Sequence, residues 1–251
     1  MALLEVEGVS KRFGGVQALR DVSFQVERGT VKGVIGPNGA GKTTLFDLVS
    51  GFRIPDGGRI RFQGRRVEGL PPHRTAALGM SRTFQEVKLF PRMTAQENVM
   101  VGRHLRSRGG FTAGLLGTPA TRREERAIAA AALEAMEFAG VLSLAGRPAG
   151  SLSYGQQRGV ELARALASEP DLLLLDEPAA GLNMRETEGL AEVVSRIRGR
   201  GVTVLLVEHD MSLVMGVCDE VAVLCFGEKI ADAPPRVVQE DPEVVRVYLG
   251  E

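Results

Sequence analysis

Short apolar runs that alternate with helix-like stretches dominate the hydrophobic pattern of the last third of the chain. The runs cover residues 172–175, 203–207 and 221–226, and the helix-like stretches cover residues 185–198 and 211–217. A parallel strand that is buried on both faces is a continuous apolar run, and strands that alternate with helices form parallel sheets. This pattern predicts an α/β fold with a mostly parallel core sheet covered by helices on both faces.

The first part of the chain has a different pattern, with β-forming segments around one helix. Strands are predicted over residues 3–9, 22–26, 31–35 and 59–62, and a helix is predicted over residues 43–48. Glycine and proline favour turns, so turns are predicted at residues 14–15 and 55–58. The N-terminal part is therefore predicted to be rich in β-structure.

Two capping boxes indicate helices in the middle of the chain. Thr94 with Glu97 predicts a helix to about residue 105, and Thr121 with Glu124 predicts another to about residue 139. Residues 107–118 are rich in glycine and are predicted to form a loop. We interpret residues 94–160 as an inserted helical subdomain, and residues 1–93 and 161–251 as the α/β core of one domain.

Six arginines give this subdomain a basic patch. They are Arg103, Arg106, Arg108, Arg122, Arg123 and Arg126. A solvated helix face is the simpler interpretation, and contact with lipid headgroups is the alternative.

Composition narrows the classes of protein. The chain has 251 residues and equal numbers of basic and acidic residues, 31 of each, whereas nucleic-acid-binding proteins usually carry a basic excess. Its two cysteines lack metal-ligand spacing, which is typical of a reduced, cytosolic chain. We find no signal-peptide pattern at the start and no apolar run near the ~20 residues that span a bilayer. Any link to a membrane is therefore expected to go through a partner.

A glycine-rich segment fits the phosphate-binding pattern GxxxxGK[ST]. It follows the predicted strand 31–35, and its last residues open the predicted helix. Its glycines let backbone N–H groups turn toward an anion, and the helix N-terminus adds partial positive charge. Lys42 is predicted to reach the β- and γ-phosphates of a nucleotide, and Thr43 to hold Mg²⁺. The alternative is a chance glycine turn. The residues assigned to nucleotide binding are Gly36, Pro37, Asn38, Gly39, Ala40, Gly41, Lys42, Thr43 and Thr44.

Two carboxylates follow the apolar run 172–175. Asp176 and Glu177 are expected at the carboxyl edge of the sheet, where open α/β folds bind ligands. Asp176 is predicted to position Mg²⁺, and Glu177 to orient or deprotonate the attacking water. The alternative is a helix cap or a surface pair after a core strand.

A third segment reads Leu-Ser-Tyr-Gly-Gln-Gln over residues 152–157. Ser153 is a good N-cap for a helix to about residue 167, which is its structural interpretation. A helix N-terminus with a hydroxyl and a bare backbone is also an anion site. The chain thus has two phosphate-binding helix N-termini, one after the phosphate loop and one at Ser153. A single nucleotide does not obviously need both of them from the same subunit. A head-to-tail dimer that shares each nucleotide between subunits resolves this.

Together these motifs resemble the ATP-binding cassette family, the ATPase subunits of ABC transporters, which have a P-loop NTPase fold. Residues 36–44 resemble its Walker A loop, residues 172–178 its Walker B strand, and residues 152–157 its signature motif. Gln85 falls at its Q-loop glutamine, His209 at its switch histidine, and Phe13 where an aromatic ring stacks on adenine. The resemblance covers essentially the whole chain, and the motifs occur in the family's order.

The resemblance implies further roles. Gln85 would touch Mg²⁺ or water and sense the membrane subunit, and His209 would contact the γ-phosphate and hold Glu177 in place. The signature residues would meet the γ-phosphate across the dimer; they are Ser153, Tyr154, Gly155 and Gln156. Three positions depart from the family pattern: Tyr154 within LSGGQ, Asn183 where many members have aspartate, and Met184 where proline often follows.

A narrower resemblance is to the ATPases of Liv-type branched-chain amino acid importers. It rests on residues 81–99, 172–183 and 207–224 and on the ending Val-Tyr-Leu-Gly-Glu. It implies permease subunits as partners, a homodimer or a heterodimer with a related ATPase, an indirect solute-binding protein, and a place on the cytoplasmic face of the inner membrane. Transport of urea, amides or lipopolysaccharide is the alternative. Two further alternatives fit the motifs and the net charge less well. One is a soluble ABC ATPase that acts on nucleic acid or ribosomes, and the other is a small P-loop kinase.

Overall fold

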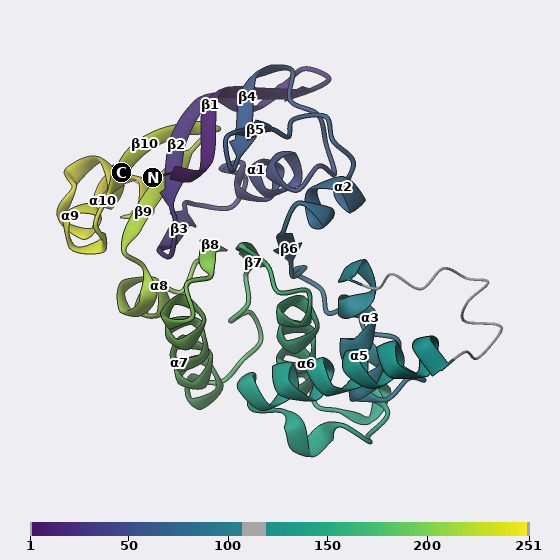
Figure 1. The fold of residues 1–251 in the computed structure, drawn as a ribbon. Coiled ribbons are helices and arrows are strands. Elements are labelled where there is room, and N and C mark those ends of the chain that lie inside the picture. The colour runs from purple at the N-terminus through teal and green to yellow at the C-terminus, as the bar shows by residue number, and fades with distance from the viewer. Residues whose placement is uncertain (1, 107–118, 250–251) are drawn as a thin grey trace. The chain divides into compact units, whose positions relative to one another are not determined.

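A computed structural model describes residues 2–106 and 119–249 of the chain (Figure 1). Its contacts divide the chain into two compact units. The first comprises Met1–Arg82 and Asp171–Glu251, and the second comprises Thr83–Pro170. The helical range predicted from the sequence, 94–160, lies inside the second unit. The loop predicted over residues 107–118, with Arg108, lies outside the described residues.

A six-stranded sheet forms the centre of the first unit, in the order β10-β9-β3-β8-β7-β6. The strands are β3 (Val31–Ile35), β6 (Met80–Arg82), β7 (Leu172–Asp176), β8 (Thr203–Val207), β9 (Glu220–Cys225) and β10 (Glu228–Ala233). All neighbours are parallel except β10, which runs antiparallel to β9. Every residue of β3, β7 and β8 is buried, as expected for continuous apolar runs in a covered parallel sheet. The predicted fold class is confirmed.

A second, antiparallel sheet in this unit has the order β2-β1-β4-β5. Its strands are β1 (Ala2–Phe13), β2 (Val16–Glu27), β4 (Gly57–Phe62) and β5 (Arg65–Arg66). The predicted turn at residues 14–15 joins β1 to β2, and Gly14 has a φ of 57° there, which glycine adopts without steric cost. The N-terminal part is rich in β-structure, as predicted.

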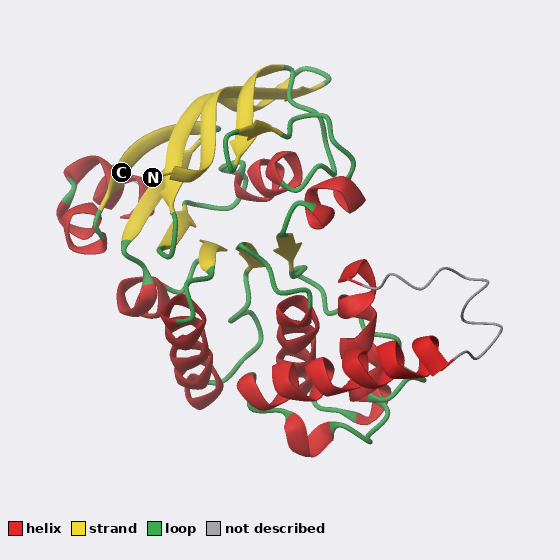
Figure 2. Ribbon diagram, in the orientation of Figure 1, coloured by secondary structure: helices red, strands yellow, loops and turns green. Residues whose placement is uncertain are grey.

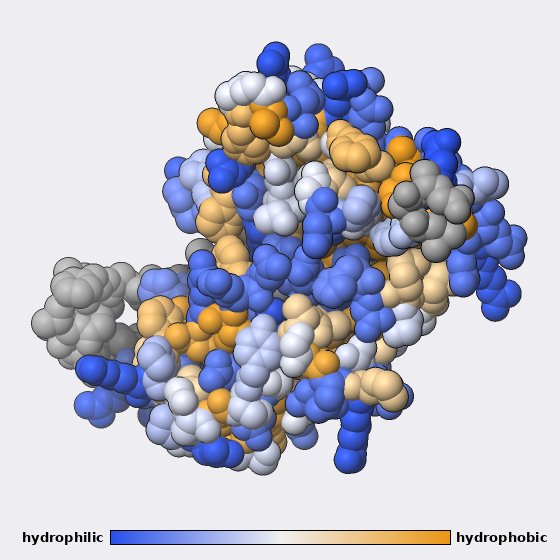
Figure 3. Space-filling view, turned by 180° about the vertical axis from the view of Figure 1, so that it is seen from behind, coloured by the Kyte–Doolittle hydropathy of each residue, from blue (hydrophilic) through white to orange (hydrophobic). Residues whose placement is uncertain are grey.

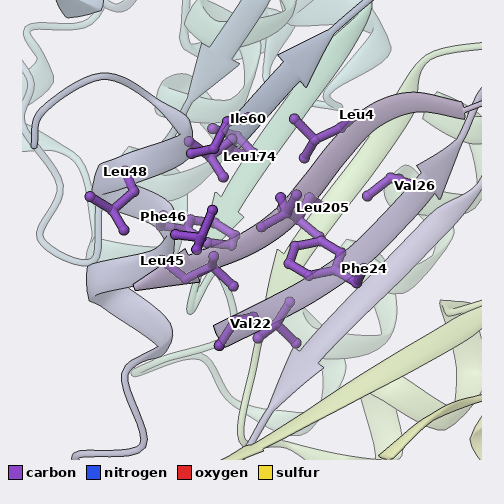
Figure 4. Packing of buried hydrophobic residues seen from close by; sticks show 14 of the residues in the cluster. Leu4, Val22, Phe24, Val26, Leu45, Phe46, Leu48, Ile60, Leu174 and Leu205 are labelled. Carbon is purple, nitrogen blue, oxygen red and sulfur yellow. The ribbon is translucent and has the colours of Figure 1, made fainter. Parts of the chain in front are cut away.

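Six helices complete the described part of the first unit. They are α1 (Lys42–Val49), α2 (Pro72–Ala77), α7 (Met184–Gly199), α8 (Met211–Val217), α9 (Pro235–Glu240) and α10 (Pro242–Leu249). The main core of the unit is formed by α1 and residues of both sheets (Figure 4). Phe46 and Leu45 of α1, Leu4 of β1, Ile60 of β4 and Leu205 of β8 are all fully buried in it. This packing fixes α1, and with it the loop that precedes α1.

The second unit is built from helices and loops in its described part (Figure 2). Its helices are α3 (Ala95–Arg103), α5 (Pro119–Phe138) and α6 (Tyr154–Ala167), with 3-10 helices η1 (His104–Arg106), η2 (Leu142–Leu144) and η3 (Ala149–Ser151). Val99, Met136 and Val160 are fully buried where α3, α5 and α6 meet. Thr94 and Glu97 form the predicted capping box of α3.

Several predicted boundaries differ from those of the structure. The first two strands are longer than predicted, since β1 extends to Phe13 and β2 begins at Val16. The second capping box, at Thr121, does not mark the start of α5, because the helix already begins at Pro119; proline is favoured in a first helical turn. Phe226 was predicted as the end of a strand, but β9 ends at Cys225. Phe226 and Gly227 have φ values of 46° and 83° and form the hairpin turn to β10, since such turns require positive φ.

The face shown in Figure 3 is largely hydrophilic, with hydrophobic residues in small groups between polar ones. None of the helices in the described ranges has the length and apolar character needed to cross a membrane.

Candidate active site

The loop between β3 and α1 has a backbone that only glycine permits at two positions. Gly36 has a φ of 147°, and a Cβ atom there would lie 2.1 Å from the carbonyl oxygen of Leu224 in β9. Gly41 has a φ of 101°, and its Cβ atom would lie 2.5 Å from the carbonyl oxygen of Ala18 in β2. The loop therefore packs closely against residues of both sheets, and glycines with positive φ are the residues that let backbone N–H groups turn toward an anion.

Neighbouring segments hold this loop by hydrogen bonds. The N–H group of Gly227 donates to the carbonyl oxygen of Ala40 at 3.1 Å, and the N–H group of Arg20 donates to the carbonyl oxygen of Gly227 at 2.8 Å. The phenol of Tyr248 in α10 lies near the backbone of Gly36, which lowers in part the pKa that burial raises. The β9–β10 turn and the last helix thus contribute to the shape of the loop.

Lys42 is buried at the start of α1. Its Nζ atom donates to the carbonyl oxygens of Gly36 at 2.7 Å and Pro37 at 3.1 Å, so the side chain folds back along the loop. Burial lowers the pKa of Lys42, and the carboxylates of Glu177 and Asp176 oppose this shift. Lys42 therefore lies close enough to both carboxylates for their charges to interact.

Asp176, the last residue of β7, is almost fully buried and pairs with Arg82 at the end of β6. The Arg82 Nη2 atom lies 2.8 Å from Asp176 Oδ2. Burial raises the pKa of the Asp176 carboxyl, although the hydrogen bond and charge of Arg82 lower it in part. Arg82 also donates to Asp47 at 2.8 Å and Ser50 at 2.9 Å. It therefore links the carboxylate of β7 to α1.

Glu177 follows directly in a strained conformation. Its φ of 45° is left-handed, which costs of order 1–3 kcal/mol in a residue other than glycine. Its N–H group donates to the carbonyl oxygen of Val207 in β8 at 2.9 Å, and its carbonyl oxygen accepts from the N–H group of Ala180 at 3.1 Å. These bonds turn the chain sharply after β7 and hold Glu177 beside the end of β8. Strain of this kind persists where surrounding contacts over-determine it, as at catalytic sites.

His209 lies just beyond the end of β8, the neighbour of β7 in the sheet. Its side chain is 61% exposed. The preceding residue, Glu208, is fully buried. Its carboxylate accepts hydrogen bonds from the backbone N–H group of Ala179, in the loop after β7, and from that of His209. Glu177 and His209 therefore lie on adjacent loops at the carboxyl edge of the sheet.

Phe13, at the end of β1, is partly exposed and stacked against cationic side chains. The guanidinium carbon of Arg53 lies 4.8 Å from the ring centroid, and Lys11 Nζ lies 5.7 Å from it. A ring with this exposure can accept a flat heterocycle.

The second unit contains the other predicted residues. Ser153 caps α6: its hydroxyl accepts from the Gln156 N–H group at 3.3 Å, and Gln156 Oε1 accepts from the Ser153 N–H group at 3.0 Å. The structural interpretation of Ser153 as an N-cap is confirmed. Tyr154 is exposed, and Arg158 lies 5.3 Å from its ring centroid.

Gln85 is held by the same helix. Arg158 donates to the carbonyl oxygen of Phe84 at 2.6 Å and also to that of Gln85. Arg164, farther along α6, donates to the carbonyl oxygen of Lys88 at 2.6 Å. Two arginines of α6 thus fix the backbone of the Q-loop segment, residues 84–88.

Asn183, a departure from the family pattern, has a local role that aspartate could also fill. Its side-chain oxygen accepts from the Glu186 N–H group at 3.0 Å, which caps α7, and its own N–H group donates to Glu186 Oε2 at 2.9 Å. Met184, the other departure nearby, is the first residue of α7 and is exposed.

Sequence reasoning missed Arg82 and Glu208. Arg82 ends a three-residue strand that was not predicted, and its function depends on the pairing of β6 with β7. Glu208 is the polar residue that follows an apolar strand, a signal that we used at Asp176 but not here.

The residues of the first unit have the chemistry to bind a nucleoside triphosphate with Mg²⁺. Its phosphate loop offers backbone N–H groups and Lys42, while the hydroxyl of Thr43 and the carboxylate of Asp176 are the oxygen ligands that Mg²⁺ prefers. A buried carboxylate such as Asp176 is also stabilised by a nearby cation.

Comparisons with known proteins agree with this geometry. The chain matches the family described as "ABC transporter" over residues 19–180, and residues 228–251 match "Branched-chain amino acid ATP-binding cassette transporter". The high-affinity branched-chain amino acid transport ATP-binding protein BraF of Pseudomonas aeruginosa is 47% identical over 250 residues, 99% of this chain and 98% of that protein. The corresponding protein LivG of Escherichia coli is 43% identical with the same coverage.

Solved structures are similar as well. A crystal structure of the ADP conformation of an ATP-binding cassette of an ABC transporter superimposes with a TM-score of 0.87 at 32% sequence identity, and each chain is covered over 100% of its length. The family match and these full-length relatives show that the chain belongs to the ABC transporter family, as an ATP-binding cassette that hydrolyses ATP.

Proposed function

We propose that this chain is the ATP-hydrolysing subunit of an importer for branched-chain amino acids. The observation that carries the proposal is the similarity of 43–47% over nearly the whole chain to proteins named for that transport. The match of residues 228–251 to a branched-chain amino acid cassette family supports it independently of the ATPase motifs.

The chemistry proposed for the first unit is an in-line transfer of the γ-phosphoryl group to water. Lys42 and the loop N–H groups hold the phosphates, and Thr43 and Asp176 would hold Mg²⁺, which neutralises developing charge when bound. Glu177 orients or deprotonates the attacking water, and His209 contacts the γ-phosphate from the neighbouring loop. Gln85 is proposed to reach the metal or the water from its own unit, and Phe13 to stack on adenine.

A head-to-tail dimer is proposed as the working state. The N-terminus of α6 carries the exposed hydroxyl of Ser153 and the bare backbone of Gly155, which together suit an anion. The γ-phosphate of the partner subunit is the proposed anion, with Tyr154 and Gln156 beside it. ATP would then hold two subunits together, and its hydrolysis would let them separate.

Permease subunits are proposed as the membrane partners, with a solute-binding protein reached only through them. The Q-loop segment, extended to about residue 98, is the proposed docking site for a cytoplasmic helix of the permease. The chain would then lie at the cytoplasmic face of the membrane as a peripheral subunit. The dimer can be two copies or one copy with a related ATPase.

An uptake measurement tests the cargo. A source-organism strain whose only copy carries Glu177→Gln is expected to lose uptake of labelled leucine, isoleucine and valine, while uptake of urea and acetamide persists. The wild-type gene returned to the same strain is the control for expression. Intact uptake of all three amino acids, with no second importer operating, would refute the cargo and leave the ATPase assignment standing.

A further inference from the structure

The side chain of Glu208 is fully buried directly after β8 and is surrounded by backbone donors. Its Oε1 atom accepts from the N–H group of Ala179 at 2.8 Å. Its Oε2 atom accepts from the N–H groups of His209 at 3.0 Å and Asp210 at 3.3 Å. A buried carboxylate is costly unless it is hydrogen-bonded, and here three donors satisfy it.

The two oxygen atoms serve two different loops. Ala179 lies two residues after Glu177 in the loop that follows β7, whereas His209 and Asp210 form the loop that follows β8. Asp210 in turn caps α8, because its side chain accepts from the N–H groups of Ser212 at 2.8 Å and Leu213 at 3.2 Å. One carboxylate thus ties the loop of Glu177 to the loop of His209 and to the start of α8.

The loop of Glu177 needs such a tie. Its left-handed backbone is strained, and the bond from the Glu177 N–H group to the carbonyl oxygen of Val207 also links these two segments. A change of about 1 Å in the position of a catalytic group can cost about 100-fold in rate. The distance from Glu177 to His209 is therefore set in large part through Glu208.

We infer that Glu208 is a positioning residue for ATP hydrolysis, which fixes His209 against Glu177 through their backbones. The inference rests on the proposed roles of those two residues. It predicts an effect on turnover rather than on nucleotide affinity, because the hydrogen bonds of Glu208 go to the loops after β7 and β8, while the nucleotide is held by the loop after β3.

The chemistry of the donors selects the decisive substitution. All three backbone groups that hydrogen-bond to Glu208 donate, so the side chain must accept at both of its oxygen atoms. Glu208→Gln preserves size and shape but places an NH₂ group against Ala179 or against the His209–Asp210 pair. One loop therefore loses its hydrogen bond whichever way the amide turns.

The experiment compares the purified variants in steady-state ATP hydrolysis with Mg²⁺ and in binding of a fluorescent ATP analogue. Glu208→Gln is expected to lower kcat by about 10-fold to 100-fold while the KM and the analogue Kd stay within about twofold of wild type. It should also accumulate the ATP-dependent dimer, as Glu177→Gln should, since nucleotide binding survives and hydrolysis is slow. Glu220→Gln removes a carboxylate that is 54% exposed and is the matched control, expected to match wild type.

A purely structural role for Glu208 makes a different prediction, in which binding and turnover fall together and no dimer accumulates. That result, or wild-type kcat in Glu208→Gln, overturns the inference. If Glu208→Gln does not fold, Glu208→Asp decides, because it keeps both acceptors but is one methylene shorter: a lowered kcat with an unchanged Kd supports positioning, and an unchanged kcat overturns it. If wild type itself does not hydrolyse ATP, the proposed function fails rather than this inference.

Discussion

Replacing Arg82 by methionine removes a guanidinium that donates hydrogen bonds to Asp47, Ser50 and Asp176. Methionine has a similar length and fills most of the volume, so the change is mainly a loss of charge and of hydrogen bonds. The acceptors are left in different surroundings. The side chain of Asp47 is 21% exposed and can be hydrated, whereas that of Asp176 is 3% exposed and cannot.

The magnitude follows from that difference. Breaking a buried ion pair by removing one partner typically costs about 3–5 kcal/mol, because an uncompensated charge stays buried. The partial exposure of Asp47 reduces its own share, so we expect the loss to come mainly from Asp176. Arg61→Met is the matched control: Arg61 is 30% exposed and pairs with Glu7 at 2.7 Å, and exposed pairs contribute about 0–1 kcal/mol.

The loss should depend on pH with a defined sign. Burial already raises the pKa of Asp176, and Arg82 is the group that lowers it, so the variant raises this pKa further. A carboxyl whose pKa is higher in the folded than in the unfolded state binds more protons when folded, and stability then falls as pH rises. The deficit relative to wild type should be largest at neutral pH and above, and should shrink as acid protonates Asp176.

Urea unfolding followed by far-UV circular dichroism measures this, since the chain has no tryptophan. Wild type, Arg82→Met and Arg61→Met are compared at a neutral and a mildly acidic pH. A deficit for Arg82→Met no larger than that of the control would refute the buried-charge argument. An equal deficit at both pH values would show that lost packing, rather than the charge of Asp176, causes it.

Three further predictions concern the same unit. Gly36→Ala should weaken binding of a fluorescent ATP analogue by about tenfold or more, because its Cβ would meet the Leu224 carbonyl; wild-type affinity would contradict that geometry. Lys42→Ala should abolish nucleotide binding or hydrolysis, and unchanged ATPase activity would disprove the role of the phosphate loop. Burial of its thiol raises the pKa of Cys218 to about 12. Cys218 is half-buried and Cys225 is buried, so Ellman's reagent at mildly alkaline pH should label neither thiol until the protein is unfolded; rapid labelling of native protein would show that the thiols are accessible.

The central strands and the phosphate loop were predictable because their signals are local. Residues 172–175 and 203–207 form apolar runs, which is the sequence pattern of a strand covered on both faces. The glycines before α1 have the spacing that a phosphate-binding loop requires. The capping boxes at Thr94 and Ser153 are equally local, since each threonine or serine meets a partner three residues away.

What the sequence could not provide depends on segments far apart in the chain. β6 has three residues, too few for a pattern, and becomes a strand by pairing with β7. The function of Arg82 follows from that pairing, and that of Glu208 follows from an N–H group in another loop. Phe226 belongs to an apolar run and still leaves the strand, because the turn to β10 requires two residues with positive φ.

The position of β3 between β8 and β9 also constrains when the nucleotide site can form. β3 and its loop are made early during synthesis, but both neighbours of β3 and the carbonyl group that presses on Gly36 come from the last fifth of the chain. A nascent chain that still lacks β8 and β9 contains every residue of its Walker A loop. It lacks the strands and the carbonyl group that hold the loop in its folded conformation. ATP binding should therefore require that translation has passed β9, and chains terminated before β8 should remain unable to bind the nucleotide.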